Sequence, residues 1–210
     1  MLVTSRGIAI AGRIGIAVAV TGALSAAAML AWPVESPPEL VRYPFTPAQF
    51  QAIQTWFFVH HLGMVAVLVG LARADVRGDG RLGRIGAWLA VVGTFLLAVQ
   101  ELITGFRFGD VAMRTANEGA MGAGYGVSTN LIGLGMVVCG IAVVRARVWT
   151  GWARWIPLAI GVMHFVVVTP AVFGGGFVAG RLAIGSWMLL FGALGLALVR
   201  RFSAPETRSP

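Results

Sequence analysis

The sequence predicts an all-α transmembrane bundle of six helices, forming a single integral membrane domain over residues 1–210. Three observations predict it: a composition poor in charge, six apolar runs of about 20 residues, and arginines that alternate between the two ends of these runs. Hydrophobic residues make up 58% of the chain and charged residues only 11%, whereas soluble domains carry about 25%. A surface so poor in charge is suited to lipid rather than to water.

The apolar runs place the helices in order along the chain. Each run is long enough to cross about 30 Å of hydrocarbon at about 1.5 Å per residue. We expect helices at residues 8–32, 47–73, 84–105, 124–145, 155–174 and 182–200.

The first run carries two signals. Gly15, Ala19, Gly22 and Ala26 form a stripe of small residues, which favours close packing against another helix. The small residues at 25–28, preceded by two arginines, leave a cleaved signal peptide open as an alternative. The run is long for such a peptide, which favours a membrane span.

Two further helix ends are marked by proline. Thr46 followed by Pro47 and Gln49 is typical of a helix start, with an N-cap, a proline at the first helical position and a glutamine three residues after the cap. Pro170 predicts that the fifth helix ends or kinks near its outer end. The segment 106–123 is Gly-rich, and we expect it to be a loop.

The arginines predict the orientation. Every basic residue is arginine, and of the sixteen, twelve flank one side of the six spans and four flank the other. The twelve are Arg6, Arg13, Arg73, Arg77, Arg81, Arg84, Arg145, Arg147, Arg154, Arg200, Arg201 and Arg208; the four are Arg42, Arg107, Arg114 and Arg181. By the positive-inside rule both termini are cytoplasmic, N-in and C-in. The charge of +8 reflects topology, and we expect no nucleic-acid partner.

Every helix also carries a polar side chain in its outer half, about 7–10 Å from the helix midpoint at about 1.5 Å per residue. Polar groups in hydrocarbon usually face a bundle interior or a wet cavity, so we expect a polar pocket between helices, open outward and closed inward. The alternative is that these groups only bond to their own backbone or bridge helices. The candidate ligand-binding residues are Gln54, Glu101, Asn130, His164, Arg181 and Ser186.

Glu101 is the leading functional candidate because an ionisable side chain at this depth usually marks a site. The alternative is a structural carboxyl held by a glutamine or arginine. His61 shares one helix face with Gln54, and we expect it to face inward rather than His60. In an enzyme, Glu101 and His61 would be the catalytic residues.

These residues allow three functions. The favoured one is a non-catalytic membrane protein that binds a lipophilic small molecule, a membrane lipid or a partner subunit, without a cofactor. The second is an intramembrane acid–base enzyme acting on a lipid or isoprenoid, with chemistry like that of terpene cyclases, through Glu101. The third is a haem b subunit ligated by His61 and His164 near the midplane. No metal site is expected, because Glu101 lies about 9 Å above the histidines along the helix axis.

Two stretches in the last third carry a resemblance. Residues 149–157, Trp-Thr-Gly-Trp-Ala-Arg-Trp-Ile-Pro, and 181–188, Arg-Leu-Ala-Ile-Gly-Ser-Trp-Met, resemble a segment common in multi-pass membrane proteins of actinobacteria. The resemblance implies a membrane location and an all-α fold in a bacterial inner (cytoplasmic) membrane. It implies no activity.

Overall fold

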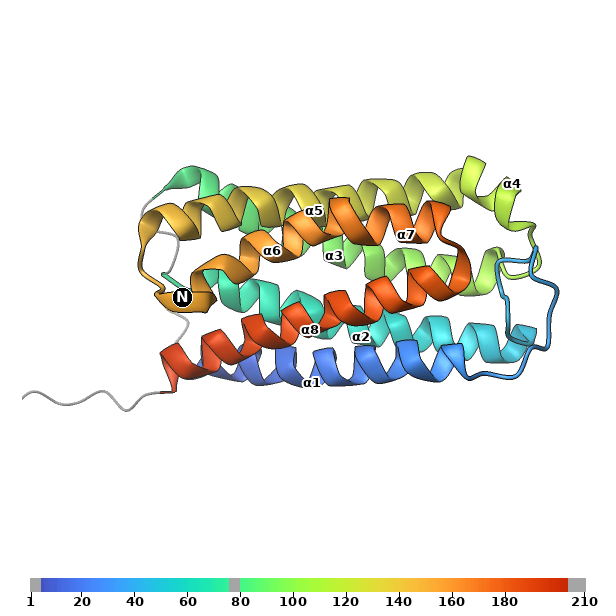
Figure 1. The fold of residues 1–210 in the computed structure, drawn as a ribbon, viewed down its shortest axis with the longest axis horizontal. Helices are drawn as coiled ribbons and strands as arrows, with labels where there is room; N and C mark the ends of the chain where they lie inside the picture. Colours follow the sequence, from blue (N-terminus) through green and yellow to red (C-terminus); the bar gives the residue numbers. More distant parts are fainter. Residues whose placement is uncertain (1–4, 76–79, 204–210) are drawn as a thin grey trace, which may run out of the picture.

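The computed structural model describes residues 5–75 and 80–203 and confirms an all-α bundle (Figure 1). Six helical segments are long and apolar enough to cross a membrane, so the chain is a multi-pass membrane protein. The segments are α1 (Ser5–Leu30), α2 (Pro47–Arg73), α3 (Arg81–Arg107), α5 (Ala120–Ala146), the composite segment Gly151–Gly174 and α8 (Gly176–Phe202). Two of the twelve arginines, Arg77 and Arg208, lie outside the described residues.

The fifth span is built from four pieces. A 3-10 turn η1 (Gly151–Trp155) leads into α6 (Ile156–Met163), a π-helical turn η2 (His164–Val168) and α7 (Thr169–Gly174). Pro170 therefore does not end the span. Proline cannot supply a backbone N–H, and the π turn just before it adjusts the hydrogen-bonding pattern so that the helix continues.

The six spans pack as a ring. Each packs on its neighbour in sequence, from α1 through α2, α3, α5 and α6 to α8, and the ring closes where α8 lies along α1 (Figure 1). The first residue of α1 and the last of α8 lie at the same end of the bundle, which we call the inner end. The opposite end, which carries α4 (Met113–Glu118), is the outer end.

Small residues let the first and last helices approach closely. The predicted stripe on α1, Gly15, Ala19, Gly22 and Ala26, is buried. A Cβ atom at Gly15 would lie 2.6 Å from a Val67 methyl group and 3.3 Å from a backbone atom of α8. The side chains Met64, Leu68, Ile132, Met136 and Phe191 are fully buried and fill the ring interior.

The start of α2 confirms the predicted cap. The Thr46 hydroxyl accepts a hydrogen bond from the Gln49 backbone N–H at 3.3 Å, and the Gln49 side chain accepts one from the Thr46 N–H at 3.0 Å. This reciprocal pair satisfies two N–H groups that a helix start otherwise leaves free.

The outer end of the ring is covered. Residues 108–119, expected to be part of a loop, contain α4, and α5 begins at Ala120 rather than at residue 124. This segment pairs with residues 31–46, and together they form what we call the outer cap. Four interactions join them: Val41 N–H to Val111 O at 3.1 Å, Arg42 N–H to Gly109 O at 3.1 Å, Met113 N–H to Glu39 O at 2.6 Å, and the Arg42–Asp110 ion pair at 2.7 Å.

Apolar side chains lie beneath this cap and join it to the bundle. They are Met29, Val41, Phe45, Phe50, Ala116 and Met121, all buried. The two external connections therefore pack against each other at the outer end of the ring, where the pocket was expected to open; the outward-opening pocket stays a prediction.

Candidate functional site

A buried polar cluster lies in the outer half of the ring. We call it the Glu101 cluster, and it consists of Gln100, Glu101 and Thr104 on α3, Tyr125 on α5 and Arg181 on α8. The Tyr125 hydroxyl donates to Glu101 Oε2 at 2.8 Å, and Gln100 Nε2 donates to Thr104 Oγ1 at 3.2 Å. Thr104 lies four positions after Gln100 and three after Glu101, so its side chain is a neighbour of both on the helix surface. Glu101 is only 8% exposed, so its carboxyl group is held inside the bundle.

Arg181 reaches the cluster from the opposite side of the ring. Its guanidinium interacts electrostatically with Glu101 and Tyr125, but these groups form no direct ion pair among the described residues. The guanidinium lies 5.4 Å from the centre of the Phe177 ring, and one of its terminal nitrogens donates to Met29 Sδ at 3.6 Å. Its Nε is buried and meets no hydrogen-bond acceptor within the described chain. Arg181 thus places a positive charge near Glu101, and its Nε–H has no acceptor among the described residues.

Gln54 lies on α2 one helical turn outward from Glu101. Gly105, four residues after Glu101, makes room for it, since a Cβ atom there would lie 2.8 Å from Gln54 Cβ. Gln54 is 7% exposed, and its Oε1 is buried with no donor in the part of the chain that the structure describes. Buried polar atoms are usually paired, so an unpaired oxygen here requires a donor from elsewhere.

Two predicted site residues do not join the cluster. Asn130 is exposed on the outside of the ring and donates to Gly126 O of its own helix at 2.7 Å. Ser186 is likewise exposed and donates to Leu182 O at 2.8 Å. Each side chain is hydrogen-bonded to a carbonyl of the preceding turn of its own helix, so neither requires a partner in the bundle interior. The expectation that they line the pocket was wrong.

The adjacent histidines are also placed differently from our expectation. His60 is the more buried, at 6% exposed, and its Nε2 donates to Val18 O of α1 at 2.8 Å. His61 is only partly buried, and its Nδ1 donates to Phe57 O of its own helix at 2.6 Å. Neighbouring residues on a helix point about 100° apart, so only one can face α1.

His164 begins the π turn and is 3% exposed. Its ring lies 5.6 Å from that of Trp187, and its Nε2 lies 3.4 Å from Thr169 Oγ1. The described residues contain no group of three or more His, Cys, Asp or Glu side chains that could hold a metal ion. The haem hypothesis, which needs only His61 and His164, remains a prediction.

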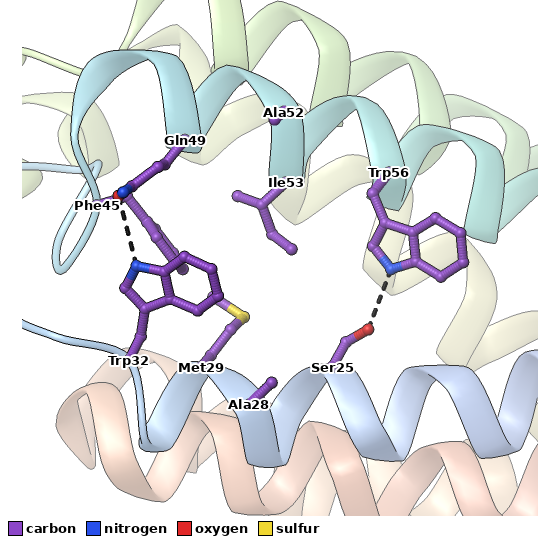
Figure 2. A pocket seen from close by; sticks show the side chains of 9 residues that line it. All are labelled: Ser25, Ala28, Met29, Trp32, Phe45, Gln49, Ala52, Ile53 and Trp56. Carbon is purple, nitrogen blue, oxygen red and sulfur yellow. Dashed lines mark hydrogen bonds between the residues drawn. The ribbon is translucent and has the colours of Figure 1, made fainter.

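A groove that the sequence analysis missed lies between α1 and α2. It is a mostly apolar hollow of about 330 Å³, and Figure 2 shows the side chains that line it. Trp56 Nε1 donates to Ser25 Oγ at 3.0 Å, and Trp32 Nε1 donates to Gln49 Oε1 at 3.4 Å. Its lining residues are Ser25, Ala28, Met29, Trp32, Phe45, Gln49, Ala52, Ile53 and Trp56. Trp32 is 41% exposed and Trp56 is 39% exposed, so the groove opens sideways, toward the lipid chains that surround the bundle.

Met29 belongs to both features. Its side chain lines the groove and also accepts the Arg181 hydrogen bond, and it is 5% exposed. The groove and the Glu101 cluster are thus separated at this point by one unbranched thioether side chain. Methionine adapts its shape more readily than other apolar residues of its size.

No family model, curated protein or solved structure matches the chain. The geometry itself offers two kinds of chemistry. An enclosed set of donors and acceptors can hold the polar group of a ligand, and a carboxyl hydrogen-bonded to a phenol can transfer a proton. Gln100, Tyr125 and Met29 were missed from the sequence. Only Tyr125 left a signal there, as one of the chain's two tyrosines and as the first polar group of its helix.

Proposed function

We propose that this protein is a multi-pass protein of a bacterial cytoplasmic membrane that binds an amphipathic, lipophilic ligand in its outer half without converting it. The twelve-to-four distribution of arginines supports an N-in, C-in orientation. The actinobacterial resemblance of the last third supports the bacterial membrane.

The ligand's chain lies in the α1–α2 groove and its polar group points toward the Glu101 cluster. Seven of the nine lining residues are aliphatic, aromatic or methionine, and the two polar ones, Ser25 and Gln49, already accept hydrogen bonds from the tryptophans. These walls suit an aliphatic or isoprenoid chain.

The polar group is an uncharged hydroxyl. Arg181 already places a positive charge close enough to interact electrostatically with Glu101 and Tyr125, so a neutral polar group suits the cluster better than a second charge. What it lacks is an acceptor for Arg181 Nε and a donor for Gln54 Oε1. A hydroxyl group is both a donor and an acceptor.

The position of Met29 carries this proposal. It is the wall between the groove and Arg181, so a small displacement of its side chain would join the hydrocarbon-lined groove to the polar cluster. A ligand could then arrive from the lipid without crossing the outer cap.

The test is the lipid content of the full-length protein purified in a mild detergent, measured by mass spectrometry after extraction. Ala52→Phe places a ring in the groove, and Glu101→Gln removes the carboxylate while keeping its shape. Both variants should lose a bound species that the wild type retains. Asn130→Ala is the matched control, because it alters an exposed polar residue on α5 and should retain the species. Identical extracts from all four proteins would contradict the proposal.

A second function is favoured by the Tyr125–Glu101 hydrogen bond of 2.8 Å. In an acid–base enzyme acting on a lipid or isoprenoid, Glu101 would exchange a proton with the substrate and Tyr125 would orient the carboxyl group. Tyr125→Phe should then retain a bound species that differs from that in the wild type in chromatographic retention and fragmentation, since unreacted substrate accumulates. Its mass is the same, because proton-catalysed isomerisation or cyclisation conserves the atoms of the substrate. The same species in both proteins would favour binding alone.

A further inference from the structure

A second candidate site lies at the inner end of the ring, where the fifth span begins. There η1 carries Trp152 and Trp155, which are 45% and 46% exposed. Tryptophans of this kind gather where the hydrocarbon of a bilayer meets its headgroups. Trp149, just before η1, is 4% exposed and belongs to the bundle core.

Two arginines are held against the exposed rings. The Arg154 guanidinium carbon lies 5.0 Å from the centre of the Trp155 ring, and that of Arg200, from α8, lies 5.8 Å from the centre of the Trp152 ring. These cation–π contacts fix two positive charges at the membrane interface. They still leave guanidinium N–H groups available for hydrogen bonds.

Two buried N–H donors at this end are unsatisfied. Neither Trp149 Nε1 nor Arg154 Nε meets an acceptor within residues 5–75 and 80–203. A buried donor without a partner is costly, and native proteins nearly always supply one from protein, water or ligand.

The segments that carry Trp149, Arg154 and Arg200, from α5 to α8, provide no negative charge of their own. No Asp or Glu occurs between Glu118 and Glu206, and neither ion pair of the described residues involves Arg154 or Arg200. The acceptor that fits two fixed guanidinium groups and an indole N–H is an oxyanion. At the depth of interfacial tryptophans, the abundant oxyanion is the phosphodiester of a phospholipid.

We propose that Trp149, Arg154 and Arg200 bind the phosphodiester of an anionic phospholipid in the leaflet that meets the inner end. Trp149 Nε1–H and Arg154 Nε–H donate to its oxygens, and Arg200 adds a second positive charge. The exposed faces of Trp152 and Trp155 lie against its glycerol and upper acyl chains. This site is separate from the Glu101 cluster and does not depend on the ligand proposed there.

The test titrates the full-length, delipidated protein with phosphatidylglycerol or phosphatidylcholine in detergent and counts bound lipids by native mass spectrometry. Arg154→Gln should weaken phosphatidylglycerol binding roughly tenfold to 150-fold, because a charge-assisted hydrogen bond of about 1.5–3 kcal/mol is lost. Trp149→Phe, which keeps the aromatic packing and removes only the N–H, should weaken it roughly threefold to tenfold. Arg13→Gln is the control, since it removes an exposed positive charge from the inner-end half of α1 and should change the affinity less than about twofold.

The other outcomes decide against the proposal. Equal affinity for phosphatidylcholine would show that the negative charge is not recognised. Displacement of the lipid by an equal concentration of inorganic phosphate would show a general oxyanion site instead of a lipid site. An effect of Arg154→Gln no larger than that of Arg13→Gln would reduce the interaction to net charge. If Arg154→Gln does not fold, the result for Trp149→Phe alone decides.

Discussion

The outer cap can be tested through Arg42, whose side chain makes two hydrogen bonds within it. Its Nε donates to Asp110 Oδ1 at 2.7 Å and one terminal nitrogen donates to Phe45 O at 2.8 Å. The Arg42 side chain is 15% exposed and that of Asp110 is 73% exposed. Removing either residue breaks the ion pair. Only Arg42→Ala also removes the hydrogen bond that the guanidinium donates to the carbonyl oxygen of buried Phe45.

The two single variants should therefore differ in stability. Asp110→Ala loses a largely solvated ion pair, which is worth about 0.5–1 kcal/mol. Arg42→Ala additionally loses a charge-assisted hydrogen bond worth about 1.5–3 kcal/mol, for a total of about 2–4 kcal/mol. At roughly 2–4 °C per kcal/mol for a chain of this size, Arg42→Ala should lower the Tm by roughly 4–16 °C and Asp110→Ala by roughly 1–4 °C.

Thermal unfolding in detergent, followed by circular dichroism or tryptophan fluorescence, measures both. The double variant should unfold where Arg42→Ala does, since the ion pair is already absent there. Arg114→Ala, in the exposed Arg114–Glu118 pair of the same cap, is the control and should shift the Tm by less than about 2 °C. Equal losses in Arg42→Ala and Asp110→Ala would contradict the assigned role of Arg42.

Three further predictions concern topology, haem and the unpaired glutamine oxygen. Cysteine placed at Asp75 should react with a membrane-impermeant maleimide only in opened cells, and cysteine at Glu118 in intact cells; the reverse pattern would invert the orientation. The haem hypothesis expects a Soret band from protein made in haem-supplied cells, lost on His61→Ala or His164→Ala, and a colourless folded wild type would exclude it. Gln54→Leu should raise the unfolding free energy of ligand-free protein by about 1 kcal/mol, because an unpaired buried polar atom is removed; a loss of stability would show that the amide has a partner.

The depth of each polar residue could be predicted from the sequence, but its direction could not. A helix rises a fixed distance per residue, so counting along α2 and α3 put Gln54 and Glu101 in the outer halves of their helices, where the structure has them about one turn apart. Rotation is harder to predict because the lipid and the bundle interior are both apolar, and the apolar pattern then hardly marks the inner face. Asn130 and His61 were misjudged for this reason.

Tertiary features account for the remaining differences. The outer cap depends on hydrogen bonds between segments about 70 positions apart, such as Arg42–Asp110, and no local pattern encodes that pairing. The groove depends on how far apart α1 and α2 lie at Ser25 and Trp56, which is a property of helix crossing rather than of either helix. The start of α2 was predicted because its capping box is contained within four consecutive residues.

The closure of the ring between α1 and α8 has a consequence for how the chain can be cut. Because the first and last spans lie side by side and begin and end at the same face, a short linker should join them without disturbing either. New termini opened between α5 and η1 would leave all six spans with their present neighbours and the same crossing directions. Such a circular permutant should insert and fold, since adjacency around the ring, rather than the order of synthesis, defines this architecture.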